Sequence, residues 1–264
     1  MKSILDLLRD PSIDGLNVDG IARLEAHAAI LARKRMLREV FSEFHHNFDR
    51  LDKRFFYASG ARIELGAGIS PMRNSYPDVL ATDIVPGPNA DEVLDAQKMD
   101  LPDSSVRAFF AQNSFHHFPH PDRFFDEVER VVAPGGGVVL LEPYFGPAAN
   151  FLFRRLFKTE TYDKNSASWD AEVSGPMTGA NQALSYLVFF RDRDIFQKKH
   201  PNLKIVHHEL CSNYLQYLLS GGLNFRQLLP DWMHPVVEIA RWLLSPFNPW
   251  LALHHLVVLR KDPE

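Results

Sequence analysis

The sequence has one cysteine, no excess of basic residues and no long uninterrupted apolar run, and each shortage excludes a class of protein. Cys211 is the only cysteine, so an internal disulfide is excluded and a reducing compartment suits the chain. The net charge of −4 gives no positive field that would attract nucleic acid. The stretch nearest to a membrane span, residues 242–259, is broken by two prolines, an asparagine and two histidines.

The N-terminus also lacks the pattern of an export signal. Asp6 and Arg9 interrupt its apolar residues, and no cleavage site of small residues follows them. The hydrophobic share of 45% and the charged share of 23% are those of an ordinary globular protein. We therefore expect a cytoplasmic protein whose 264 residues form one large domain or a domain with a subdomain.

The first part of the chain is predicted to be helical. Between residues 21 and 56, large apolar residues recur every three or four positions, which is typical of the buried face of a helix. We assign residues 1–58 to an N-terminal helical extension that precedes the main domain.

From residue 61 the pattern changes to short apolar runs that alternate with helical segments. Strands are predicted at residues 61–65, 78–83, 107–112 and 136–142, with the clearest helix at 122–132. Apolar strands that alternate with helices form a parallel sheet that is covered on both faces. We therefore predict an α/β domain over residues 59–264, with its first half at 59–146.

Two segments interrupt this alternation. Residues 147–200 contain a long polar, loop-like region, and we interpret them as an insert or lid. Residues 212–250 are aromatic, helical and broken by prolines. They lie between two further predicted strands, 204–210 and 254–261.

The motif ELGAGIS at residues 64–70 joins the first strand to the next element. Gly66 and Gly68 allow the backbone to turn tightly and to approach a ligand closely. Ser70 is a good N-cap and Pro71 suits the first position of a helix, so a helix is predicted to follow. A dinucleotide site would need a third glycine where Pro71 stands, which disfavours an oxidoreductase.

Polar residues follow the next strands in the same way. Asp83 ends the second strand, where a carboxylate can accept hydrogen bonds from both hydroxyls of a ribose. The segment LDAQKMDLP (94–102) follows the third strand and AQNSFHHFPHP (111–121) the fourth, and VVAPGGGVVLLEP (131–143) turns into the fifth.

With these segments, residues 61–146 resemble the class I S-adenosylmethionine-dependent methyltransferases, especially the ubiquinone- and menaquinone-biosynthesis methylases and the sugar O-methyltransferases. The resemblance implies a Rossmann-like, seven-stranded, mostly parallel sheet whose last strand is antiparallel. It implies S-adenosyl-L-methionine as cofactor and S-adenosyl-L-homocysteine as product. The family often has a third glycine where Ser70 stands in this sequence.

The resemblance also assigns cofactor-binding residues. The matching positions are Glu64, Gly66 and Gly68 around the methionine part, Asp83 at the ribose, Asp95 and Ala96 beside the adenine, and Asn113 and Ser114 along the cofactor.

For catalysis the resemblance to sugar O-methyltransferases implies a histidine and an acid, and His117 and Glu142 stand at the matching places. An alcohol must lose a proton when it is methylated, so a base within hydrogen-bond reach helps. The fourth and fifth strands should be neighbours about 5 Å apart, which lets Glu142 orient His117. The alternative is that alignment alone drives transfer and that Glu142 only caps a helix or holds a loop.

No metal site is expected. The doublets His45–His46, His207–His208 and His254–His255 show no metal-binding pattern, and neighbours in a strand face opposite sides of the sheet. Packing is the expected role of these histidines, although His45 and His46 could line a substrate lid.

Several functions compete with small-molecule methylation. A nucleic-acid amino-methyltransferase would carry a D/N-P-P-F/Y element after the fourth strand, where this chain has NSFHH. A module that binds S-adenosylmethionine without catalysis ranks second to an enzyme.

The acceptor is predicted from the aromatic stretch, from the resemblance to sugar O-methyltransferases and from the pair of His117 and Glu142, which an alcohol acceptor would need. The tryptophans and tyrosines of 212–250 could wall an apolar pocket or stack on sugar faces, could pack a core of their own, or could lie against a membrane surface. We favour a hydroxyl of a saccharide or lipid-linked glycan as acceptor. A quinone-type or other small acceptor is the main rival.

Overall fold

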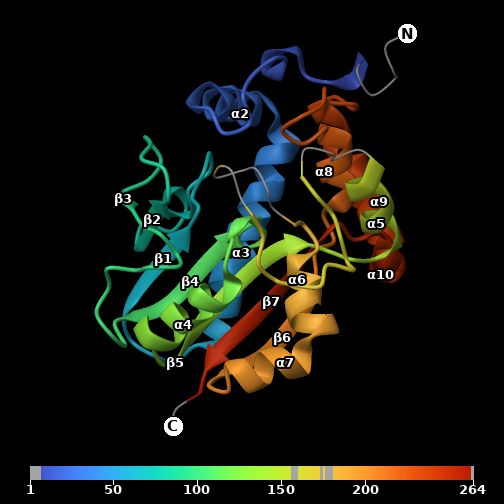
Figure 1. Cartoon of the computed structure of the whole chain (residues 1–264). Coiled ribbons are helices and arrows are strands. Elements are labelled where there is room, and N and C mark those ends of the chain that lie inside the picture. The colour runs from blue at the N-terminus through green and yellow to red at the C-terminus, as the bar shows by residue number, and fades with distance from the viewer. Residues whose placement is uncertain (1–6, 156–159, 173–174, 176–180, 263–264) are drawn as a thin grey trace.

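The protein is described here from a computed structural model, which covers residues 7–155, 160–172, 175 and 181–262. Its frame is a seven-stranded sheet with the strand order β3-β2-β1-β4-β5-β7-β6. β7 pairs antiparallel with both of its neighbours, and the other pairs are parallel, so six strands share one direction (Figure 1). The predicted sheet, with its antiparallel last strand, is confirmed. The strands are β1 (Ala61–Leu65), β2 (Val79–Asp83), β3 (Glu92–Val93), β4 (Val106–Gln112), β5 (Val132–Pro143), β6 (Leu203–Leu210) and β7 (His254–Lys261).

Helices precede, cover and extend the sheet. The α-helices are α2 (Ile21–Arg33), α3 (Arg35–Phe55), α4 (Pro121–Val131), α5 (Pro147–Arg155), α6 (Leu184–Tyr186), α7 (Arg193–Lys199), α8 (Tyr214–Ser220), α9 (His234–Leu244) and α10 (Asn248–Leu251). Short 3-10 helices are η1 (Pro11–Ile13), η2 (Met72–Asn74), η3 (Phe115–His117), η5 (Asp231–Met233) and η6 (Ser245–Phe247), and η4 (Leu187–Arg191) is a π-helix. Over the described residues, no helix is both long and apolar enough to cross a bilayer.

The two faces of the sheet bury separate apolar clusters. On one face, Phe109 of β4 lies in a cluster with Phe124 and Phe125 of α4. On the other, Phe110 lies in a cluster with Phe44 and Phe48 of α3. Neighbouring residues of a strand point to opposite faces, so the two adjacent phenylalanines pack into the apolar layers on both sides of the sheet. The helix α3 belongs to the segment that we expected to form an N-terminal extension, and it covers one face of the sheet (Figure 1).

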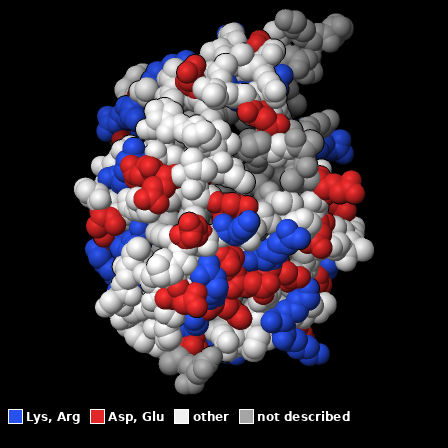
Figure 2. Space-filling view, turned by 60° about the vertical axis from the view of Figure 1, so that its left-hand side comes forward, with Lys and Arg blue, Asp and Glu red and all other residues white. Residues whose placement is uncertain are grey.

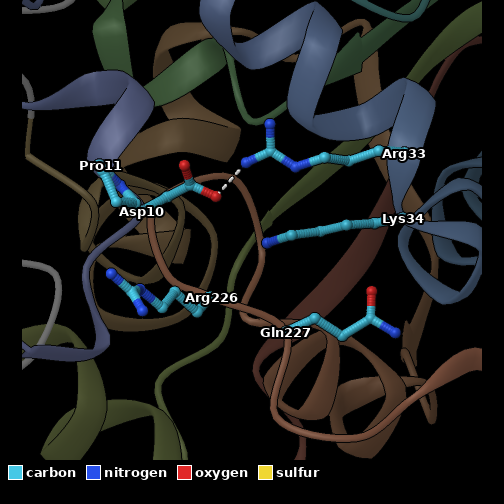
Figure 3. A pocket seen from close by; sticks show the side chains of 6 residues that line it. All are labelled: Asp10, Pro11, Arg33, Lys34, Arg226 and Gln227. Atoms are coloured by element: carbon cyan, nitrogen blue, oxygen red, sulfur yellow. Dashed lines mark hydrogen bonds and ion pairs between the residues drawn. The ribbon is translucent and has the colours of Figure 1, made fainter.

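The helix predicted over residues 21–56 is interrupted at Lys34. This residue has extended backbone angles, ending α2 and beginning α3. Its ammonium group donates to the backbone carbonyls of Gly222 and Phe225, at 2.7 and 2.5 Å. Lys34 lines an open surface pocket of about 400 Å³ between the N-terminal segment and the turn after α8. Figure 3 shows its side chain pointing into this pocket, with Arg226 on the other side. The break thus coincides with a contact to a distant turn, which the apolar periodicity does not reveal.

The helix predicted to start at Ser70 and Pro71 does not form. Only the 3-10 helix η2 follows, and no side chain caps it. The carboxylate of Glu64 accepts the hydrogen bond of the Met72 amide at 2.7 Å instead. The next strand already begins at Val79, which leaves too short a connection for an α-helix of usual length.

Candidate active site at the carboxyl edge of the sheet

The residues predicted to bind cofactor gather where β1, β2 and β4 end. In an open α/β sheet this carboxyl edge is the usual place for ligands. Gly66 follows β1, Asp83 ends β2, and Asn113 and Ser114 follow β4. The parallel register of β1 with both β2 and β4 places these ends side by side (Figure 1).

The glycine loop after β1 depends on left-handed backbone conformations. Gly66 has φ of 71° and Gly68 has φ of 54°, values that residues with a side chain rarely adopt. A Cβ atom at Gly66 would lie only 2.9 Å from the Cβ of Ser114. The Ser114 hydroxyl donates to the Leu65 carbonyl at 3.0 Å, so the loops after β1 and β4 are in direct contact.

Asp83 connects the glycine loop to the end of β2. One carboxylate oxygen accepts the Gly68 amide at 3.1 Å, and the other accepts the Val85 amide at 3.2 Å. The side-chain amide of Asn89 donates to the Gly68 carbonyl at 2.9 Å. Sequence reasoning missed Asn89, which lies in a loop of glycine and proline that carries no motif.

The remaining predicted cofactor residues occupy distinct environments. Asp95 accepts the Gln97 amide at 2.8 Å and shapes the turn after β3, while Ala96 is buried in the core. Asn113 has φ of 51°, and its side-chain oxygen is buried without a hydrogen-bond partner among the described residues. Burial raises the pKa of Glu64 to about 8, although the Met72 amide opposes this shift. The side chains of Asp83 and Asn113 therefore bring polar oxygens to the carboxyl edge of the sheet.

The partner of Glu142 differs from the expected one. Glu142 is fully buried, and its Oε2 lies 2.5 Å from Nδ1 of His116, not of His117. Its other oxygen accepts the Phe115 amide at 3.0 Å. The prediction that Glu142 orients His117 is therefore wrong. The two histidine rings lie side by side in η3, with centroids 4.3 Å apart, but only that of His116 reaches Glu142.

A second carboxylate, which the sequence did not reveal, completes the group. Nε2 of His116 lies 3.2 Å from Glu160, and Nε2 of His117 lies 3.9 Å from the same carboxylate. Glu160 comes from the polar segment that was interpreted as a lid, and no motif marks it. Ligand atoms of His116, His117 and Glu160 lie within 4.8 Å of one another, so these three could hold a metal ion, although no metal site was expected.

The charges of this group follow from its contacts. Burial alone would lower the pKa of His116, but the carboxylates of Glu142 and Glu160 raise it to about 10. Burial alone would raise the pKa of Glu160, but the hydrogen bond from His116 lowers it. Burial and the neighbouring His116 cation lower the pKa of His117 to about 3. At neutral pH His116 is therefore a cation between two carboxylates, and His117 beside it is neutral.

The tryptophans of the aromatic stretch do not line an internal pocket. Trp232 and Trp242 are 75% and 73% exposed, and Trp250 is also exposed. Tyr214 is buried, and Tyr217 stacks edge-on against His254 with ring centroids 5.3 Å apart. The buried Tyr214 and the half-buried Tyr217 therefore fit the expected apolar lining better than the three tryptophans do.

The comparisons with known proteins agree with this architecture. Residues 66–140 match a family described as a methyltransferase domain. No curated protein sequence matches the chain. Among solved structures, geranyl diphosphate C-methyltransferase from Streptomyces coelicolor A3(2) is 11% identical, with 96% of this chain and 89% of that chain covered and a TM-score of 0.50.

Two further similar structures are also methyltransferases. An S-adenosylmethionine dependent methyltransferase from Mesorhizobium loti is 14% identical over 80% of this chain and 96% of that chain, with a TM-score of 0.43. Phosphoethanolamine N-methyltransferase 2 from Haemonchus contortus is 12% identical over 91% of this chain and 57% of that chain, with a TM-score of 0.48. Residues 66–140 thus match a methyltransferase domain, and the chain has the Rossmann-like fold of methyltransferases.

Proposed function

We propose that this protein transfers the methyl group of S-adenosylmethionine to a hydroxyl group of a saccharide or lipid-linked glycan. The observation that carries the proposal is the neutral His117 beside the Glu142–His116–Glu160 group, at the same sheet edge as the glycine loop. A neutral imidazole can accept the proton that a hydroxyl must release when it is methylated.

The residues around the glycine loop fit the cofactor. Gly66 and Gly68 keep the backbone open to close approach, Asp83 offers two carboxylate oxygens for the ribose, and Asn113 has an unpaired buried oxygen. Asp95, Ala96 and Ser114 complete the proposed cofactor site. When bound, S-adenosylmethionine supplies an electrophilic methyl group, and the protein supplies alignment and shelter from water.

The chemistry needs only a weak base. The cofactor, when bound, would supply the methyl group and leave as S-adenosylhomocysteine, and methylation would make the proton of the acceptor hydroxyl strongly acidic. His117 accepts that proton, and the resulting imidazolium is stabilised by the nearby carboxylate of Glu160. The lowered pKa of His117 keeps the imidazole neutral before transfer, so it is ready to accept the proton at any pH above about 3.

A turnover assay tests the proposal directly. The protein is incubated with S-adenosylmethionine and with free saccharides, polyprenyl-linked saccharides or quinols, and S-adenosylhomocysteine and methylated products are measured by mass spectrometry. We expect methyl ethers on a saccharide. Cofactor binding without any product would identify a non-catalytic binding module, and methylation of a quinol alone would favour the quinone-type alternative.

Replacing Asp83 by alanine should weaken the binding of both S-adenosylmethionine and S-adenosylhomocysteine. Losing a pair of charge-assisted hydrogen bonds should cost about 1.5–3 kcal/mol, which titration calorimetry measures. Asp83→Asn keeps the shape and removes the charge, and Asp100→Ala is a control at an exposed carboxylate of the same half. Wild-type protein that binds neither compound would contradict the proposed function. Unchanged affinity in Asp83→Ala would remove only the role of this residue.

A further inference from the structure

The helix α9 turns its polar side chains toward the protein. His234 Nε2 lies 2.6 Å from Glu39 of α3, and Arg241 binds both carboxylate oxygens of Glu43 on α3, at 2.7 and 2.8 Å. Glu238 accepts a hydrogen bond from Gln216 of α8. The polar stripe of α9 is therefore anchored on α3 and α8.

The opposite side of the same helix is apolar and faces outward. Ile239 is 61% exposed, and Val236, Trp242 and Leu243 are exposed with it. Val237 is the only apolar residue of the helix that is fully buried. A surface helix of a globular protein normally places its apolar stripe on the core, so the orientation of α9 is inverted.

The exposed apolar surface continues beyond α9. From Leu228 to Trp250, every residue classed as exposed is apolar or proline except Ser245, while the charged side chain of Glu238, on the polar stripe, is 41% exposed. The helix α10 packs against α5, which adds the exposed Phe151. We call this surface the tryptophan face; its main members are Phe151, Trp232, Ile239, Trp242, Phe247 and Trp250.

The exposed charges that flank this surface along the chain are basic, whereas Asp231 and Glu238 within it are half-buried. Two exposed arginines, Arg154 and Arg155, end α5 next to Phe151, and the exposed Arg226 precedes Leu228 at the other end of the stretch. The face brought forward in Figure 2 is different, because basic and acidic side chains lie side by side on it. An apolar surface with arginines at its borders is complementary to an anionic lipid layer.

We propose that the tryptophan face docks this protein on the surface of an anionic membrane. Three of the four tryptophans of the chain are exposed on it, and tryptophan prefers the level of the lipid headgroups, where its ring is buried and its N–H stays hydrated. A protein partner would need about one hydrogen bond per 100–200 Å² of interface. The face offers few such groups, namely the Ser245 hydroxyl, the indole N–H groups and, at its edge, the carboxylate of Glu238.

The position of the face suits a lipid-linked acceptor, and this step rests on the proposed function. The helix α10 ends at Leu251, and β7 begins at His254, which pairs with Pro143 next to Glu142. The docking surface and the candidate active site therefore lie at the same edge of the sheet (Figure 1). A glycan attached to a membrane lipid would reach His117 without leaving the bilayer surface.

Vesicle flotation of the full chain tests the docking, without cofactor or acceptor. Vesicles of phosphatidylcholine with phosphatidylglycerol should carry the wild-type protein upward. Ile239→Glu should lower the partition coefficient about tenfold or more, because it places a charge where an apolar side chain entered the lipid. Ile195→Glu is the matched control, since Ile195 is 50% exposed on α7, away from the face.

A second variant tests the role of the arginines. Replacing both Arg154 and Arg155 by glutamine should lower the partition coefficient on anionic vesicles about fivefold for each arginine that is removed. The partition coefficient on pure phosphatidylcholine vesicles should not change.

Three results would overturn the docking proposal. The wild-type protein could stay at the bottom of the gradient with both vesicle types. The Ile239→Glu variant could float to the same extent as the wild type. Alternatively, light scattering could show a dimer that Ile239→Glu dissociates, which would make the face a contact between two copies. Binding of S-adenosylhomocysteine, measured on the same preparations, verifies that each variant is folded. If the protein floats but methylates no saccharide, the docking proposal stands and only the proposed function is contradicted.

Discussion

Replacing Glu142 by alanine should lower the free energy of unfolding by about 3–5 kcal/mol, the usual effect of removing one partner of a buried ion pair. Glu142 is fully buried and holds both the His116 ring and the Phe115 amide. Without it, the buried imidazole loses its nearest carboxylate and the amide loses its acceptor. Urea unfolding followed by circular dichroism measures the change.

Two further variants separate charge from packing. Glu142→Gln keeps an acceptor for the Phe115 amide, so its loss of stability should be smaller than that of Glu142→Ala. Glu209→Ala removes a partly exposed carboxylate paired with Arg50 and should cost only about 0–1 kcal/mol. A Glu142→Ala protein as stable as Glu209→Ala would show that the His116 pair contributes little.

The same pair predicts how stability depends on pH. The pKa of His116 is raised from 6.5 to about 10, so the folded chain holds this proton more tightly than the unfolded chain. The stabilisation is complete below 6.5 and is lost as the pH rises through about 10. Between these values the wild type should lose stability faster than Glu142→Gln. Parallel curves for the two proteins would contradict the raised pKa.

Replacing His117 by alanine should lower turnover about a hundredfold or more, while the affinity for S-adenosylhomocysteine stays near that of the wild type. The proton of the acceptor hydroxyl then has no neutral imidazole to receive it. The pKa of His117 in the wild type is lowered to about 3. The turnover of His117→Ala should therefore stay below that of the wild type at every higher pH at which the protein is folded. Single-turnover rates with saturating cofactor measure the effect on the chemical step.

Matched variants distinguish a base from a structural residue. His120→Ala changes an exposed histidine a few residues along the same loop and should leave turnover unchanged. Glu160→Gln keeps the shape of the carboxylate and should slow transfer without weakening cofactor binding. Full turnover in His117→Ala would show that alignment alone drives the reaction. Turnover that is lost with a chelator and restored by a divalent ion would identify His116, His117 and Glu160 as metal ligands instead.

The parts of the protein that were predictable depend on local sequence. The four strands from 61 to 142 were located by short apolar runs, because a strand buried on both faces must be apolar throughout. The turn at Gly66 and Gly68 was located because the left-handed conformation there strongly favours glycine. The positions of Asp83 and Asn113 at one edge then follow from parallel strand order.

Other features depend on contacts between distant segments. Glu142 lies 26 residues from His116 and Glu160 lies 44 residues from it, so no local pattern specifies that they meet. A shift of one residue, from His117 to His116, changed the partner of Glu142. In the same way, the aromatic content of residues 212–250 was compatible with a pocket wall, a core or a membrane surface.

The sheet and the glycine loop could be predicted from residues 61–146 alone, because they follow from backbone conformation and from the alternation of apolar runs. The contacts of the folded chain were needed to show which histidine Glu142 binds, that Glu160 joins it, and which side of α9 faces outward. The carboxylates of Glu39 and Glu43 on α3 bind the polar side of α9 and leave its tryptophan side exposed. Such choices depend on how separately formed elements dock, and docking is set by charges and shapes that lie far apart along the chain.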